Sequence, residues 1–373
     1  MKKILTIYPT GGGRFEGGIT VLMNFLIDNY YDFNQSLKIT HLNSNQINRI
    51  NTGKDKLLLI NFLNAFKLLI ALKKEVKTNN YDFIYYHSSS NFALLKDLFI
   101  LNFFSIKKIL HIHFSEFEKV MPSNKILRRL ILYLINKTCD GLILMNNSFK
   151  TELMNSYNFS KPIIKPIYNF IPFFNLKKPI VKTKICHKNK DCLNFLFVGS
   201  LESRKGLKQI ILSYKNFINN SNSCSKLNIV GEFQDPNYKI EVMDLVVNNI
   251  KSENIIFLGK LNRNQITNIY KDSDVLIMNS VSEGLPVVLL ESLYHGLAII
   301  TTPVGAIPEI LSNSINSLYT DNSDDLIGLE NNLHTLNNDR LILARLKNNN
   351  KKLSEKFTLK NFLYDFNNLL DEI

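Results

Sequence analysis

The alternation of short apolar segments with longer helical ones constrains the fold of this chain more than any other feature. Each half of the chain contains six segments with the length and composition of buried strands. The strand candidates are 3–8, 38–42, 83–87, 108–113, 141–145 and 163–168, then 194–199, 226–231, 254–259, 274–280, 297–302 and 316–320. Because helical segments separate them, the pattern predicts two parallel sheets with helices on both faces.

A break in this pattern at 171–192 separates the two runs. It contains Pro172, Pro179 and many lysines but little periodicity, which is typical of a linker. The predicted parts are a first domain at 1–172, a linker at 173–192, a second domain at 193–355 and a C-terminal helix at 356–373. We expect this last helix to cross back to the first domain.

The net charge of +13 is unevenly distributed. Residues 1–180 contain 24 Lys and Arg against 11 Asp and Glu, whereas residues 181–373 contain 21 of each class. The excess predicts an anionic partner for the first half, either nucleic acid or a membrane surface with lipid-linked phosphate. A genome composition that favours Lys, Asn and Ile is the alternative explanation.

The cysteines and apolar runs bear on the compartment. Cys139, Cys186, Cys192 and Cys224 form no CxxC pair, so we expect free thiols, no zinc site and a cytoplasmic protein. The first residues are typical of a strand, and their apolar run is too short for a secretory signal. No uninterrupted apolar run reaches the roughly 18 residues of a membrane span.

Two glutamates eight positions apart bracket the most informative stretch of the chain. Glu283 follows a predicted strand, and Glu291 lies in the next helix, where Pro286 suits the first helical position. The two carboxylates can accept hydrogen bonds from hydroxyls, while the amides of Gly284 and Leu285 can bind an anion at the helix N-terminus. A sugar nucleotide is polyhydroxylated and anionic, and therefore fits this site.

Two loops, one after the first strand of each half, contain groups suited to phosphate. The five glycines at 11–18 let the backbone approach a ligand, but their spacing matches neither the dinucleotide fingerprint nor the P-loop. In the second half, Arg204 and Lys205 are predicted to open a helix after a strand. Because cations at a helix N-terminus oppose its dipole, we interpret the pair as ligands of a diphosphate and not as a solvated basic pair.

Three further polar residues lie in or directly after predicted strands. His111 and His113 alternate on one strand and face the same side. A metal site would need a third ligand, and the sequence indicates none. We expect His113 to face the ligand and His111 to be structural. Asn169 lies near Pro172 and is either a site residue or a turn residue.

Together these residues resemble the retaining glycosyltransferases of family 4, which have two facing Rossmann-like domains, the GT-B fold. The two glutamates are similar to that family's E-x7-E motif, and Val198-Gly-Ser-Leu-Glu-Ser-Arg-Lys-Gly is similar to its diphosphate loop. Thr301-Thr-Pro-Val-Gly-Ala-Ile-Pro-Glu is similar to the segment that follows. The chain departs from the family pattern at Val287, where Asn is frequent, and at Ser292, where Ala is frequent.

The resemblance implies a role for each residue. Arg204 and Lys205 would bind the donor diphosphate, Glu283 the sugar hydroxyls and Glu291 the ribose hydroxyls. The implied donor-binding residues are Gly17, Gly18, Ser200, Arg204, Lys205, Gly259, Leu261, Glu283, Gly284, Leu285, Pro286, Val287 and Glu291. The implied catalytic residues are Glu283, His113, Arg204 and Lys205. Asn169 would lie on the acceptor side, and neither a metal nor another cofactor is expected.

The resemblance also implies the reaction. A hexose or N-acetylhexosamine would move with retention from a nucleotide diphosphate sugar, UDP-linked by expectation, to a hydroxyl of a lipid-linked glycan in bacterial surface polysaccharide assembly (O-antigen, capsule or lipopolysaccharide). The alternatives are a sugar-nucleotide 2-epimerase or hydrolase on the same scaffold, and a non-catalytic nucleotide-sugar-binding subunit. A nucleic-acid binder would leave the paired glutamates without a purpose, and no nucleic-acid motif is visible, so we expect no such partner.

Two predicted helices of the first domain bear on the acceptor. Residues 56–77 and 92–110 mix Phe and Leu with Lys, which could seat a helix in an anionic membrane interface. The alternative is a core-facing helix with a solvated Lys face. We expect peripheral binding to the inner face of the cell membrane.

Overall fold

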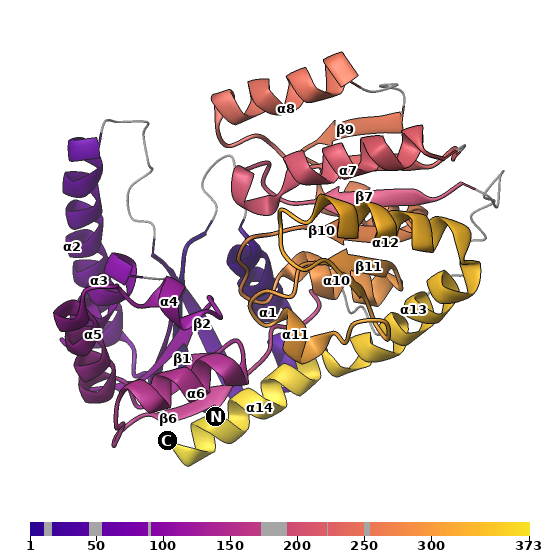
Figure 1. The fold of residues 1–373 in the computed structure, drawn as a ribbon. Helices are drawn as coiled ribbons and strands as arrows, with labels where there is room; N and C mark the ends of the chain where they lie inside the picture. Colours follow the sequence, from indigo (N-terminus) through magenta and orange to yellow (C-terminus); the bar gives the residue numbers. More distant parts are fainter. Residues whose placement is uncertain (11–16, 45–53, 89–90, 173–191, 222, 250–253) are drawn as a thin grey trace. The chain divides into compact units, whose positions relative to one another are not determined.

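The computed structural model describes the chain except for residues 11–16, 45–53, 89–90, 173–191, 222 and 250–253. Two compact units are distinguished, the first comprising Met1–Pro172 and Phe357–Ile373 and the second Phe173–Lys356 (Figure 1). Each unit contains one six-stranded parallel sheet, as the sequence predicts. Nearly all of the predicted linker and most of the glycine loop lie outside the described residues.

The first unit has the strand order β2-β1-β3-β4-β5-β6. Its strands are β1 (Lys2–Tyr8), β2 (Leu37–Asn43), β3 (Phe83–Ser88), β4 (Lys107–Ile112), β5 (Gly141–Leu144) and β6 (Ile163–Pro166). Its helices are α1 (Gly18–Phe33), α2 (Lys54–Thr78), α3 (Asn91–Leu101), α4 (Phe117–Val120), α5 (Lys125–Thr138), α6 (Asn147–Ser156) and α14 (Leu359–Glu372). The strand order reverses between β1 and β3. The carboxyl ends of these two strands therefore form the switch point, where sheets of this kind bind ligands.

The C-terminal helix α14 packs on the first unit, as predicted, and contacts α1. Its buried residues recur at helical spacing, and among them Phe366 lies against Tyr85 of β3 with ring centroids 4.7 Å apart. Ion pairs from Lys2 to Asp371 and from Lys165 to Glu372 fix its far end. The C-terminal helix therefore contributes to the core of the first unit, most of which is formed by the N-terminal part of the chain.

The second unit has the strand order β12-β11-β10-β7-β8-β9. Its strands are β7 (Asn194–Val198), β8 (Lys226–Val230), β9 (Ile255–Gly259), β10 (Val275–Met278), β11 (Ala298–Thr301) and β12 (Leu318–Tyr319). Its helices are η1 (Ser203–Lys205), α7 (Leu207–Asn219), α8 (Pro236–Asn249), α9 (Arg263–Asp272), α10 (Val287–His295), α11 (Ile307–Ile310), α12 (Leu326–Asn338), α13 (Arg340–Leu353) and η3 (Ser354–Lys356). Here the switch point lies between β7 and β10.

The cysteines differ from the expectation of free thiols. Cys192 and Cys224 form a disulfide with their Cα atoms 5.1 Å apart, whereas Cys139 is a buried free thiol. The pairing follows from the sheet, because β7 and β8 are neighbours with Asn194 opposite Lys226, which brings the residues two positions earlier together. Cys186 lies outside the described residues.

Within the described ranges, no helix combines the length and apolar character that spanning a membrane requires.

Candidate functional site

The carboxylate of Glu283 contacts both predicted cations at the switch point of the second sheet. Lys205 Nζ lies 2.6 Å from Glu283 Oε1, and Arg204 Nη1 lies 3.9 Å from Oε2. Ser280 Oγ also donates to Oε1 at 2.6 Å. The Glu283 side chain is only 8% exposed, so these groups compensate a nearly buried charge.

The loop after β7 is tied to the segment after β10. Arg204 Nη1 donates to the carbonyl of Ser282 at 2.6 Å, and the Arg204 carbonyl accepts from the amide of Val281 at 2.9 Å. Glu202 holds the other arm of the guanidinium, with Nη2 2.7 Å from Oε1, and Ser200 donates to the same carboxylate oxygen. The guanidinium is thus oriented from both sides and remains 41% exposed.

The position of this cationic pair corrects one expectation. Arg204 and Lys205 lie in the short 3-10 turn η1 and not in the first turn of α7, which begins at Leu207. Gly206 separates the two with a φ of 67°, and a Cβ there would lie 2.1 Å from the carbonyl oxygen of Asn279. Glycine therefore allows the turn to approach the end of β10, and the helix-dipole argument does not apply to this pair.

The second glutamate lies on α10, which differs slightly from the predicted helix. Pro286 is the N-cap residue, with φ −66° and ψ 130°, and the helix begins at Val287. A proline has no N–H to donate, and its fixed φ is compatible with the extended backbone of a cap. Before the cap, the carbonyl of Gly284 accepts from the amide of Ala306 at 3.1 Å, and Leu285 is buried.

Glu291 has two partners that the sequence analysis missed. Arg263 Nη1 lies 3.0 Å from Oε1, and the Tyr270 hydroxyl donates to Oε2 at 2.7 Å. Burial raises the pKa of Glu291, and the two partners oppose that shift. Asn262 and Gln265 form a capping box at the start of α9, and this sequence signal could have placed Arg263 on the first turn.

Other residues of the implied donor set lie at the ends of strands and helices. Gly259 ends β9 with a φ of 65°, and no described atom lies within 4 Å of a Cβ placed there. Gly17 precedes α1 and Gly18 begins it. Leu261 and Val287 are half-buried. Their roles toward a donor stay predictions.

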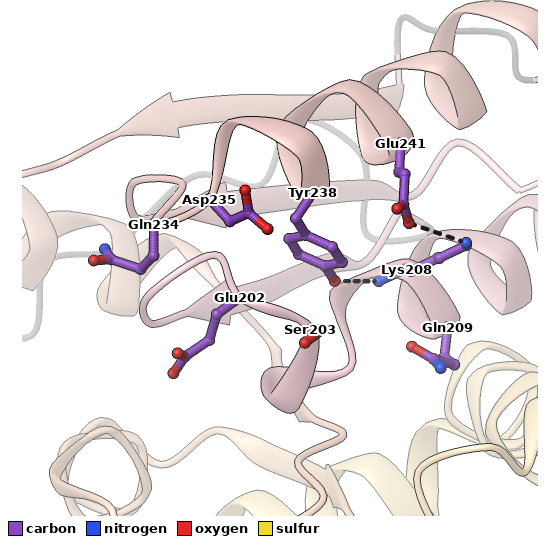
Figure 2. A pocket seen from close by; sticks show the side chains of 8 residues that line it. All are labelled: Glu202, Ser203, Lys208, Gln209, Gln234, Asp235, Tyr238 and Glu241. Atoms are coloured by element: carbon purple, nitrogen blue, oxygen red, sulfur yellow. Dashed lines mark hydrogen bonds and ion pairs between the residues drawn. The ribbon is translucent and has the colours of Figure 1, made fainter. Parts of the chain in front are cut away.

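A pocket of about 580 Å³ lies beside this site (Figure 2). Its lining consists of Glu202, Ser203, Lys208, Gln209, Gln234, Asp235, Tyr238 and Glu241. The lining contains three carboxylates, those of Glu202, Asp235 and Glu241, and one cation, Lys208, which lies 3.4 Å from Glu241. Negative charge therefore exceeds positive charge in the lining. An anionic diphosphate is therefore not assigned to this pocket, which meets the site through Glu202.

In the first unit, three histidines gather near the switch point. His87 of β3 pairs with His111 of β4, and His113 follows that strand. These three residues, here called the histidine cluster, each offer a ring nitrogen within 4.8 Å of the others. Burial lowers the pKa of all three, that of His113 to about 3. The sequence indicated no third candidate ligand, and His87 supplies one here because parallel pairing aligns it with His111.

Asn169, expected on the acceptor side, lies beyond the end of β6 in the first unit. It is buried. Its role toward an acceptor stays a prediction.

Comparison with known proteins gives consistent matches. Residues 182–353 match the family described as Glycosyl transferases group 1. The chain is 25% identical over 272 residues to an uncharacterized 41.2 kDa protein in the cps region of Klebsiella pneumoniae, covering 71% of this chain and 72% of that protein. It is 26% identical over 312 residues to the UDP-Gal:alpha-D-GlcNAc-diphosphoundecaprenol alpha-1,3-galactosyltransferase of Escherichia coli, covering 80% and 78%.

A solved structure shows the fold. HepE from Anabaena, in complex with UDP-glucose, matches with a TM-score of 0.72 at 17% identity over 100% of both chains. The fold is therefore GT-B, as the sequence resemblance implies.

Proposed function

Because the chain belongs to the group 1 glycosyltransferases, we propose that it transfers a hexose or N-acetylhexosamine, with retention, from a UDP-sugar to a hydroxyl of a glycan. The observation that supports this most is that Lys205 and Arg204 both contact Glu283 near the carboxyl ends of β7 and β10. In such a donor the diphosphate lies directly beside the sugar hydroxyls. The two cations can bind the diphosphate, and the neighbouring carboxylate can accept hydrogen bonds from the hydroxyls.

The cationic pair is assigned to the diphosphate. Arg204 offers a planar fork that can hold two phosphate oxygens, and Lys205 offers a point charge that can bridge Glu283 and a phosphate. The side chain of Lys205 is 19% exposed, so it keeps access to a ligand while it contacts Glu283. Glu283 in turn accepts from hydroxyls of the sugar.

Glu291 is assigned to the ribose. A carboxylate offers about four lone-pair sites, and Arg263 and Tyr270 occupy one on each oxygen. The remaining sites can accept two neighbouring hydroxyls of a ribose. The two protein partners hold the carboxylate in one orientation, which lowers the entropic cost of binding.

The reaction breaks the bond between the anomeric carbon and the diphosphate oxygen and forms one to the acceptor oxygen. Its main difficulty is the charge that develops on the departing diphosphate, which Arg204 and Lys205 are positioned to stabilise. Attack from the face of the leaving group lets the departing phosphate accept the acceptor proton, so Glu283 is not assigned as a nucleophile. His113 keeps its sequence-based assignment to the reacting centre, and no Mg²⁺ is required for a diphosphate held by two cations.

The chemical test is the configuration of the product. The expected result is an α-linked product from an α-linked donor, formed equally well in EDTA. Release of free sugar or isomerisation of the donor without an acceptor would favour the hydrolase or epimerase alternative. Donor binding without any turnover would favour a non-catalytic subunit.

The acceptor is proposed to be lipid-linked, with the protein bound to the inner face of the membrane and acting in surface polysaccharide assembly. The Escherichia coli relative is named for a diphosphoundecaprenol-linked acceptor. In the first unit, Phe66 of α2, Phe99 of α3 and Phe103 in the turn after α3 are exposed, and Lys73 lies over the Phe103 ring at 5.2 Å. Exposed aromatic rings beside lysines suit an anionic interface.

Flotation with vesicles of anionic lipid tests the membrane proposal. The protein is expected to float at low salt and to be released by high salt. The double variant Phe99→Ser/Phe103→Ser should lose flotation. Ile240→Ser/Val247→Ser, which removes two exposed apolar side chains of α8 in the second unit, is the matched control and should float normally. Equal flotation of both variants, or none of the wild type at low salt, would count against the proposal.

A further inference from the structure

The histidine cluster has a hydrogen-bonding deficit at its centre. The Nε2 atom of His111 is buried and has no hydrogen-bond partner among the described residues. Its other ring nitrogen, Nδ1, lies 2.6 Å from the Tyr85 hydroxyl. Whichever nitrogen carries the proton, Nε2 is left as an unpaired donor or acceptor, which is unfavourable in a buried place.

The neighbouring rings present nitrogens to the same region. His87 Nδ1 lies 2.8 Å from His113 Nε2, and the rings of His111 and His113 stack with centroids 4.0 Å apart. The nitrogens that the three side chains offer all lie within 4.8 Å of one another. Nitrogens bound to one tetrahedral ion lie about 3.3 Å apart, given Zn–N bonds of about 2.0–2.1 Å. Small rotations about the last side-chain torsion, which is broad for histidine, cover the difference.

The outward-facing ring nitrogens have oxygen partners. His87 Nε2 lies 3.2 Å from Thr6 Oγ1, and His111 Nδ1 lies against the Tyr85 hydroxyl. A histidine that binds a metal commonly donates its second ring N–H to an oxygen, which fixes the tautomer and the ring plane. This arrangement is present for two of the three rings.

We propose that His87, His111 and His113 bind one transition-metal ion of the Zn²⁺ class, with the unpaired Nε2 of His111 as one ligand atom. Three imidazoles suit Zn²⁺, Co²⁺, Ni²⁺ or Cu²⁺ and not the hard cations Mg²⁺ and Ca²⁺, which prefer oxygen. This site is therefore separate from the metal-free diphosphate binding proposed above. Binding itself does not depend on the proposed function. Its consequence does: a bound ion would withdraw His113 from the reacting centre, so Zn²⁺ should inhibit transfer and chelators should relieve the inhibition.

The experiment is a titration of chelator-treated protein with Co²⁺, followed by its visible absorption. The expected result is saturation at one equivalent, with a tetrahedral-type spectrum that lacks a thiolate charge-transfer band. His113→Asn, at the partly exposed end of the cluster, should bind at least about tenfold more weakly. His334→Asn, a histidine of α12 in the second unit, is the matched control and should titrate like the wild type.

A second measurement keeps the test decisive if a variant fails to fold. In wild-type protein with ¹⁵N-labelled histidine rings, Zn²⁺ should shift three of the seven histidines. No binding at micromolar Co²⁺, unchanged affinity in His113→Asn, or shifts confined to other histidines would overturn the proposal. UDP binding measured on the same samples separates this outcome from a failure of the proposed function.

Discussion

Removing the charge of Lys205 is the perturbation whose effect the structure predicts most fully. Lys205→Met keeps most of the side-chain volume but leaves the Glu283 carboxylate with Ser280 and the more distant Arg204 guanidinium. Because that carboxylate is almost buried, it cannot regain the lost interaction from water. The loss should appear as a lower free energy of unfolding.

The magnitude follows from the geometry. Unit charges 2.6 Å apart attract by about 6 kcal/mol at an effective dielectric constant of about 20, and desolvation offsets part of this. Breaking a buried pair from one side costs roughly 3–5 kcal/mol. Since the Lys205 side chain is 19% exposed, we expect about 2–4 kcal/mol for Lys205→Met. Glu283→Gln should cost less, because the amide oxygen still accepts from Ser280.

The assay is a double-mutant cycle measured by urea unfolding. Lys205→Met, Glu283→Gln and their combination should give a coupling energy above about 1 kcal/mol. The matched control is the pair Lys208–Glu241, at 3.4 Å with side chains 42% and 58% exposed, for which less than about 0.5 kcal/mol is expected. If the two cycles gave the same coupling, the account of a compensated buried charge at the site would be refuted.

Three further predictions concern the loop, the ribose site and the histidine cluster. Gly206→Ala should lower the free energy of unfolding by more than about 2 kcal/mol, because its φ is positive and its Cβ meets the Asn279 carbonyl, whereas Gly259→Ala carries only strain of about 1 kcal/mol. Equal urea midpoints for the two would contradict the steric argument. Glu291→Gln should weaken UDP binding about 10- to 100-fold, since a hydrogen bond to a charged group contributes about 1.5–3 kcal/mol, and calorimetry showing unchanged affinity would exclude the ribose role. Burial lowers the pKa of each histidine of the cluster, so below the ordinary histidine pKa of 6.5 the unfolded chain binds more protons than the folded one, and stability should fall as the pH decreases from there. The expected slope is up to about 1.4 kcal/mol per pH unit for each histidine, and unfolding curves that do not change between about pH 7 and pH 5 would disprove it.

The sequence predicted the two sheets because their strands are short, apolar and separated by helices. It also placed Arg204 and Glu283 each after a predicted strand of the second half, and the carboxyl ends of neighbouring parallel strands lie on the same side of a sheet. The structure places these side chains in contact, although the helix-dipole reasoning for the cationic pair was wrong. The right juxtaposition therefore came from topology and not from local electrostatics.

What the sequence did not indicate depends on contacts between distant segments. Nothing local to Glu291 identifies Arg263 or Tyr270 as its partners, because the pairing needs the packing of α9 against α10. His87 was missed for a similar reason, since its neighbour His111 is aligned by strand register. Likewise, the Cys192–Cys224 bridge follows from the adjacency of β7 and β8 and not from spacing in the chain.

The most direct test of the donor site is the affinity difference between a nucleoside diphosphate and its monophosphate. Isothermal titration with UDP and UMP, repeated with GDP and GMP, would measure it for the wild type and for Arg204→Met/Lys205→Met. The account predicts that the wild type binds one diphosphate at least about tenfold more tightly than its monophosphate, a difference of about 1.4 kcal/mol, and that the folded variant loses this preference. Equal affinities in the wild type, or an undiminished preference in the variant, would contradict the assignment of these two cations.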